Sequence, residues 1–186
     1  VTEIAATMAF SATQNYDKIG LMLFSDEIDL YIPPKKGRSH VLRLIRELIE
    51  FQPKSHKTDI AQALKFLSGT QKKKAIVFMI SDFMCENYEQ TLKIASKKHD
   101  ITGIRVYDIR EEKMPNLGMV TMLDAETGRT QLINTGSKTV RMNYEKHYQD
   151  KVNYFKETFR KSGSGVVNTR VDESYVTKLL SYFKSR

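Results

Sequence analysis

The sequence predicts an α/β fold of the doubly wound kind, in which helices cover both faces of a mostly parallel sheet. Two observations lead to this prediction. Helical and strand patterns alternate along almost the whole chain, and this order of elements builds an open parallel sheet. In addition, residues 75–80 read AIVFMI without one polar position, as expected for a parallel strand that is covered on both faces.

The N-terminal half predicts a helix, a hairpin and a second helix. Apolar residues at helical spacing in residues 3–14 are followed by a buried strand at 19–24 and by period-two alternation at 28–32. Pro33-Pro34 should end this second strand, because proline cannot donate to a ladder. An amphipathic helix is then expected at 38–51.

The rest of the chain continues the alternation. A short helix should start after Thr58-Asp59, where Asp59 and Gln62 have the spacing of a capping box, and should end at Gly69. The later elements are then expected in this order: strand 75–80, helix 87–98, strand 101–107, helix 141–161, strand 165–171 and helix 173–184.

One segment interrupts this order. Two short strands at 119–123 and 129–133 flank Asp124 to Gly128, a loop that ends at a glycine able to take positive φ. They predict a hairpin at about 119–133 that lies outside the main sheet.

Size and composition limit the class of protein. The 186 residues, with 40% hydrophobic and 28% charged side chains, fit one globular domain spanning 1–186. The longest apolar run has six residues, far short of the ~20 of a membrane-spanning helix. The single cysteine, Cys85, excludes an internal disulfide and favours the reducing cytoplasm. The chain opens at Val1 in a helical pattern, so we interpret it as part of a longer protein.

Polar residues follow the expected strands at the edge where ligands bind in such sheets. They are Ser25, Asp26, Ser81, Asp82 and Asp108, with Thr58 at a helix start on the same edge. Hydroxyls and carboxylates suit a hard cation such as Mg²⁺. Each residue also has a structural explanation: Thr58 or Asp59 as a helix cap, Asp82 as a turn cap, and Asp108 as a partner of Arg110.

Other kinds of site have little support. The chain has no phosphate-binding glycine loop, no Gly-x-Ser-x-Gly elbow and no His-x-x-x-His pair. Cys85 has no histidine nearby in sequence, so we interpret it as an inert thiol. The net charge of +8 suggests nucleic-acid binding as an alternative, but the basic residues are spread over many segments. The one dense run, Lys72 to Lys74, is interpreted as the solvated lead-in to a strand.

Nine short blocks, taken in order, point to a known family. The blocks are GLMLFSD at 20–26, PPKKGR at 33–38, HVLR at 40–43, IREL at 45–48, TDI at 58–60, SDF at 81–83, HD at 99–100, DIRE at 108–111 and DAETG at 124–128. With these blocks the chain closely resembles the second half of the bacterial proteins called domain-of-unknown-function family 58, which are von Willebrand factor A-like proteins associated with MoxR ATPases.

The resemblance implies a von Willebrand factor A-like fold with a metal-ion-dependent adhesion site. There, an Asp-x-Ser-x-Ser motif, a threonine and an aspartate hold a divalent cation. Thr58 takes the threonine role by resemblance and Asp82 the aspartate role. The chain contains no Asp-x-Ser-x-Ser; by resemblance the motif would lie just upstream of Val1, on the central strand. We therefore expect Mg²⁺ or another divalent cation in the intact protein, and no tightly held cation here.

A missing central strand would leave a gap between strands 19–24 and 75–80, with two unpaired edges through which the chain could form oligomers. The function expected from the resemblance is a non-enzymatic adaptor that binds a protein partner, a MoxR-type AAA+ ATPase, and not nucleic acid. The alternatives are a basic nucleic-acid-binding domain and a metal-dependent hydrolase using Asp26, Asp82 and Asp108. No base or nucleophile accompanies those three carboxylates in the sequence.

Overall fold

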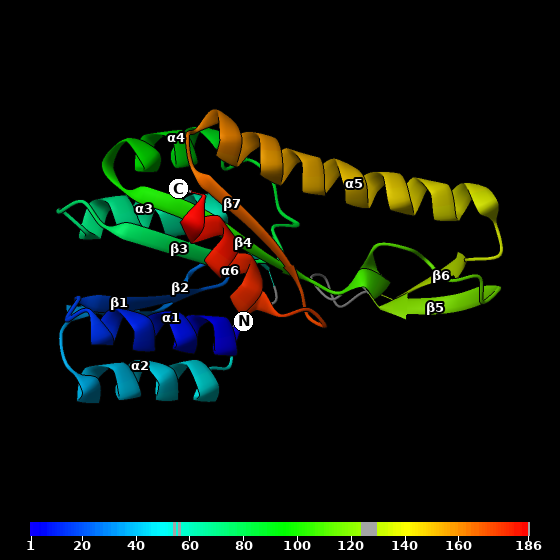
Figure 1. Ribbon diagram of the computed structural model, residues 1–186. Helices are drawn as coiled ribbons and strands as arrows, with labels where there is room; N and C mark the ends of the chain where they lie inside the picture. Colours follow the sequence, from blue (N-terminus) through cyan, green and yellow to red (C-terminus); the bar gives the residue numbers. More distant parts are fainter. Residues whose placement is uncertain (54, 56, 124–129, 186) are drawn as a thin grey trace.

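The computed structural model describes residues 1–53, 55, 57–123 and 130–185, and its centre is a three-stranded parallel sheet (Figure 1). The strand order is β3 (Ile76–Ser81), β4 (Asp100–Tyr107) and β7 (Gly165–Arg170). Ile76 lies opposite Asp100, and Thr102 lies opposite Gly165. The parallel pairing and the helix that precedes each strand confirm the predicted mixed α/β class.

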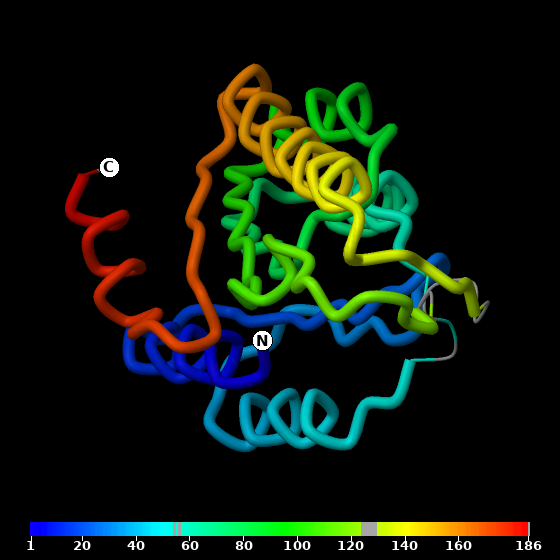
Figure 2. The backbone as a smooth tube through the Cα atoms, turned by 90° about the vertical axis from the view of Figure 1, so that its right-hand side faces the viewer, coloured from blue at the N-terminus to red at the C-terminus, as the bar shows by residue number. Residues whose placement is uncertain are grey.

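Helices cover both faces of this sheet (Figures 1 and 2). Ile101 of β4 packs on one face with Leu92 and Phe155. The neighbouring Ile104 points to the other face and packs with Ile4 and Leu179. The first face is thus covered by α3, α4 and α5, and the second by α1 and α6. These helices are α1 (Thr2–Gln14), α3 (Ile60–Thr70), α4 (Glu89–Lys98), α5 (Lys138–Lys161) and α6 (Tyr175–Lys184).

Helix α5 packs unusually close to β4 because residue 103 is glycine. A Cβ atom at Gly103 would lie 2.6 Å from the ring of Phe159 and 2.8 Å from that of Phe155. Both rings are fully buried, and the Phe83 ring stacks on Phe155 with centroids 4.2 Å apart. The close approach therefore fixes α5, β4 and the loop after β3 in one packed unit.

The first two strands form a separate antiparallel pair. β1 (Ile19–Phe24) pairs with β2 (Ile28–Lys35), and α2 (Arg38–Glu50) packs against α1 and β1. Within the described residues β1 is not hydrogen-bonded to β3. The strand at 19–24, expected as one of the strands of the mostly parallel sheet, therefore does not join that sheet by hydrogen bonds. The expected gap between 19–24 and 75–80 is present, because no described strand lies between them.

Several boundaries also differ from the predictions, by one to three residues. β2 continues through Pro33-Pro34 to Lys35. The register with β1 is irregular at this point, so the ladder does not need the backbone N–H groups that the two prolines lack. α3 continues through Gly69 to Thr70, where the glycine is exposed with open space around its Cα. α5 starts at Lys138, three residues before the expected helix.

The predicted hairpin is confirmed as a separate antiparallel pair. β5 (Met119–Leu123) pairs with β6 (Thr130–Asn134), beside the N-terminal end of α5 and away from the central sheet (Figure 1). The expected loop from Asp124 to Gly128 lies outside the described residues.

Candidate functional site

Three loops meet at the carboxyl edge of the sheet. The Asp59 amide donates to the Ser25 carbonyl over 2.9 Å, which joins the loop after β1 to the start of α3. Cys85, in the loop after β3, is close enough to Asp59 and Asp82 for both carboxylates to raise the pKa of its thiol, although burial is the largest cause. The loops that carry Ser25, Thr58-Asp59 and Asp82 are thus neighbours, as the strand-end rule predicts.

Asp82 lies in a loop that its neighbours hold in place. Its Oδ1 accepts hydrogen bonds from the Ser81 hydroxyl and the Met84 amide, each at 3.3 Å. The next residue, Phe83, has a φ of 56° and a fully buried ring, so core packing stabilises a strained backbone. The expected turn-capping role of Asp82 is confirmed. The carboxylate is nevertheless exposed, and its Oδ2 has no hydrogen-bond partner among the described residues.

Of the two neighbouring residues Thr58 and Asp59, Asp59 caps the helix and Thr58 does not. The Asp59 Oδ1 accepts from the Gln62 amide at 2.9 Å and caps α3. The half-buried Thr58 makes no side-chain hydrogen bond to the part of the chain that the structure describes. Its hydroxyl is therefore available to a ligand.

The chemistry of these donors fits a hard cation, but their number is small. Within residues 1–53, 55, 57–123 and 130–185, no group of three or more His, Cys, Asp or Glu side chains could hold a metal ion. Thr58 and Asp82 would therefore serve as two oxygen anchors, and water would fill the other positions, a pattern that Mg²⁺ tolerates.

The other strand-end carboxylates are not part of such a group. Asp108 accepts from the backbone amide of Arg110 at 2.9 Å and starts the short helix η1 (Ile109–Glu111). Its expected partner is thus confirmed, but the contact is a backbone cap. Asp26 is exposed and accepts a long 3.5 Å bond from the Ser25 hydroxyl. The described structure does not gather Asp26, Asp82 and Asp108 as the hydrolase alternative requires.

A buried arginine lies directly beneath Asp82, and sequence reasoning missed it. Arg105 is 2% exposed, and its Nε donates to the Asp82 carbonyl over 3.1 Å. Its Nη2 donates to the Tyr148 hydroxyl over 2.6 Å, and its guanidinium lies 4.3 Å from the centre of the Tyr107 ring. No described carboxylate pairs with it. The available signal was the spacing from Gly103, which puts Arg105 on the sheet face beneath α5.

The whole carboxyl edge is acidic. The segments that follow the parallel strands, residues 82–89, 108–113 and 171–175, contain eight Asp or Glu residues and only two Lys or Arg. Acidic side chains here also stabilise the helix N-termini that start at this edge. The surplus of negative charge attracts cations, whether metal ions or basic groups of a partner.

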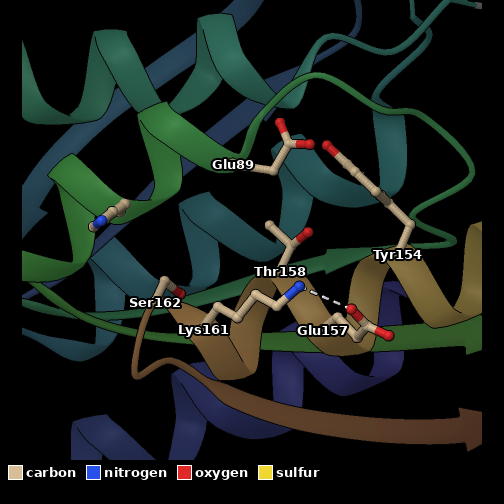
Figure 3. A pocket seen from close by; sticks show the side chains of 7 residues that line it. Glu89, Tyr154, Glu157, Thr158, Lys161 and Ser162 are labelled. Atoms are coloured by element: carbon tan, nitrogen blue, oxygen red, sulfur yellow. Dashed lines mark hydrogen bonds and ion pairs between the residues drawn. The ribbon is translucent and has the colours of Figure 1, made fainter.

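A shallow pocket of about 310 Å³ lies elsewhere, between α4 and α5 (Figure 3). The Glu89 carboxylate and the Tyr154 hydroxyl face each other across it, and Lys161 pairs with Glu157 at 2.9 Å. Burial, with help from Glu89, raises the pKa of Tyr154 to about 12. This phenol therefore stays protonated at neutral pH and is not an activated nucleophile.

Comparison with known proteins gives a family and distant relatives. Residues 1–154 match the family model described as protein of unknown function DUF58. An uncharacterized protein of Mycobacterium avium is 25% identical over 158 residues, which is 83% of this chain and 93% of that protein. An uncharacterized protein of Mycobacterium tuberculosis is 22% identical over 98% of this chain, and the chain spans 58% of that relative's length.

Two solved structures have a similar fold at 14% sequence identity. One is an aerotolerance-related membrane protein from Bacteroides fragilis, with a TM-score of 0.54 over 100% of this chain and 89% of that chain. The other is BatB from Bacteroides thetaiotaomicron, with a TM-score of 0.51 over 99% of this chain and 86% of that chain. In the present structure, none of the described helices has the length and apolar character needed to cross a bilayer.

Proposed function

The chain belongs to the DUF58 family of proteins of unknown function, and from that premise we propose that it is a non-enzymatic protein-interaction module. Its acidic carboxyl edge binds a partner with the help of a hydrated divalent cation. Thr58 and Asp82 would hold that cation. When bound, the cation would supply positive charge that a partner's carboxylate can ligate.

One observation above all supports this proposal. Loops far apart in the sequence converge at the carboxyl edge and present oxygen donors there: the Thr58 hydroxyl and the exposed Asp82 carboxylate. Behind them, Arg105 and the buried Phe83 ring hold the Asp82 backbone. Donors on a held backbone need little rearrangement when a ligand arrives. No described general base accompanies the exposed carboxylate, which favours binding over catalysis.

The partner in this proposal is a MoxR-type AAA+ ATPase, for which the chain acts as an adaptor in the cytoplasm. The von Willebrand factor A-like resemblance of the sequence motifs supports this partner, and the single cysteine supports the compartment. One edge of β1 and one edge of β3 pair with no other strand in the described part of the chain. These edges offer a further route to assembly, because unpaired strand edges accept strands of other chains.

The test is calorimetric titration of the full natural protein with magnesium chloride, comparing Asp82→Asn with Asp108→Asn. Each substitution removes one charge from the same edge, and each original carboxylate accepts one nearby backbone amide. Asp82→Asn should weaken magnesium binding at least tenfold, whereas Asp108→Asn should change it less than threefold. These fold-changes correspond to about 1.4 and 0.7 kcal/mol.

The same two variants should then be tested for magnesium-dependent capture of the MoxR-type ATPase from the same bacterium. The proposal requires loss of capture in Asp82→Asn and in chelator, with capture kept in Asp108→Asn. Equal magnesium affinity in both variants would refute the cation site. Capture that depends neither on magnesium nor on Asp82 would refute partner binding at the carboxyl edge.

A further inference from the structure

The opposite edge of the parallel sheet has the reverse charge. Helices α3, α4 and α5 end where β3, β4 and β7 begin, and α6 runs back to the same edge. The segments there, residues 71–75, 96–100, 159–164 and 181–185, contain one acidic residue and eight basic ones. The basic residues are Lys72, Lys73, Lys74, Lys97, Lys98, Arg160, Lys161 and Lys184.

Hydrogen bonds link these segments to one another or to the neighbouring helix and strand, and so place them side by side. The Ser96 and Ser164 hydroxyls lie 2.8 Å apart and join the ends of α4 and α5. Lys98 Nζ donates to the Ser68 carbonyl over 2.8 Å and joins α4 to α3. The Tyr182 and Thr102 hydroxyls, 3.0 Å apart, bring the end of α6 to the start of β4. We call the surface of these segments the amino edge.

Local helix electrostatics explain only part of the positive charge. Basic residues in the last turns of α4, α5 and α6 stabilise the negative helix ends. Lys72, Lys73 and Lys74 lie in the connection before β3, outside any helix. All three are exposed, and their side chains form no ion pair with any residue that the structure describes.

Apolar side chains are exposed on the same surface. Ile76 at the start of β3 is 68% exposed, and Ile94, four residues before the end of α4, is 65% exposed. Phe183 near the end of α6 contacts Phe78 of β3 and is still 46% exposed. Lysines mixed with exposed isoleucine and phenylalanine fit a surface that offers both anionic groups and an apolar layer beneath them.

We propose that the amino edge docks on an anionic phospholipid surface, with the lysines at the headgroups and the three apolar side chains inserted between them. This occupant fits better than nucleic acid, because single strands bind through aromatic stacking platforms and Phe183 is the one aromatic residue among the exposed apolar side chains of this edge. The surface lies across the sheet from Thr58 and Asp82, so docking leaves the carboxyl edge free.

The experiment measures binding of the full chain to sedimented vesicles of phosphatidylcholine alone or with one-quarter phosphatidylglycerol. Binding should require phosphatidylglycerol and should weaken as salt is raised. Changing Lys72, Lys73 and Lys74 to glutamine should lower the partition coefficient roughly 100-fold, because each lysine near an anionic surface contributes about fivefold and the three factors multiply. The matched control changes Lys113, Lys138 and Lys146 to glutamine, which are exposed near the opposite end of α5, and should retain binding within threefold.

A second variant tests insertion separately from charge. Ile94→Ser keeps the net charge and should reduce binding roughly tenfold or more, because burial of an aliphatic side chain contributes at least a factor of this size. Equal losses in the two lysine triples would refute the assigned surface, because net charge alone would then explain binding. Tighter binding to duplex DNA than to phosphatidylglycerol vesicles, or unchanged binding by Ile94→Ser, would refute the phospholipid assignment.

Discussion

Replacing Arg105 by methionine should destabilise the folded protein by about 3 kcal/mol. The contacts of Arg105 in the structure give the contributions to this free energy of unfolding. Two hydrogen bonds from a charged donor, to the Asp82 carbonyl and the Tyr148 hydroxyl, contribute ~1.5–3 kcal/mol each, and the stacked Tyr107 ring contributes ~0.5–2 kcal/mol. Burial of an unpaired charge offsets several kcal/mol of this sum.

The assay is urea unfolding followed by circular dichroism. A loss of about 3 kcal/mol in a chain of this length lowers the melting temperature by roughly 6–12 °C. Tyr148→Phe is the matched variant, because it removes one hydrogen bond to the charged guanidinium and keeps the ring, and it should cost ~1.5–3 kcal/mol. In the double variant the two losses should fall short of additivity by about the same amount, since both remove the same bond.

An Arg105→Met variant that is as stable as the natural protein would refute this reasoning. It would mean that desolvation of the guanidinium cancels all its contacts. The Asp82 loop would then be held by the buried Phe83 ring alone, and Arg105 would have no part in shaping the candidate site.

Three further predictions concern packing, pH and the hairpin. Gly103→Ala should cost ~1–3 kcal/mol in urea unfolding through its clash with Phe159, whereas Gly69→Ala, in a helix with open space, should be neutral or stabilising. Burial lowers the pKa of His99 below 6.5 in the folded protein. On acidification the unfolded chain therefore binds a proton at His99 at higher pH than the folded chain does, so the free energy of unfolding should fall as pH drops below 6.5. His99→Leu should remove this contribution to the pH dependence of stability. Deleting residues 119–133 should leave the circular dichroism spectrum of the core intact, and global unfolding would show that the hairpin is structural.

Much of the fold follows from local patterns. The apolar run at 75–80 and the alternation of elements are enough to predict parallel pairing with β4, because both are properties of contiguous sequence. The meeting of Ser25, Thr58-Asp59 and Asp82 follows from the rule that parallel strands end at one edge. The boundary errors at Pro33-Pro34 and Gly69 arose because an irregular ladder and an exposed last turn tolerate residues that usually end elements.

Two features could not be predicted because they depend on packing between distant segments. A single arginine in a strand looks solvated until α5 is placed over it through Gly103. The basic residues look scattered along the sequence, and Lys72 to Lys74 look like a solvated lead-in to a strand. Only the folded sheet brings these lysines to the same edge as the ends of α4, α5 and α6.

The opposite charges of the two sheet edges give the molecule an electric dipole along its strands. A strand of six residues spans roughly 20 Å, so the positive and negative groups are separated by about twice the screening distance at physiological salt. Near any charged surface this dipole produces a torque before contact, and the molecule rotates as it approaches. Beside a negative surface, the edge that carries Lys72 to Lys74 turns toward it and Asp82 turns toward the solvent. The charge pattern thus selects an orientation as well as an affinity.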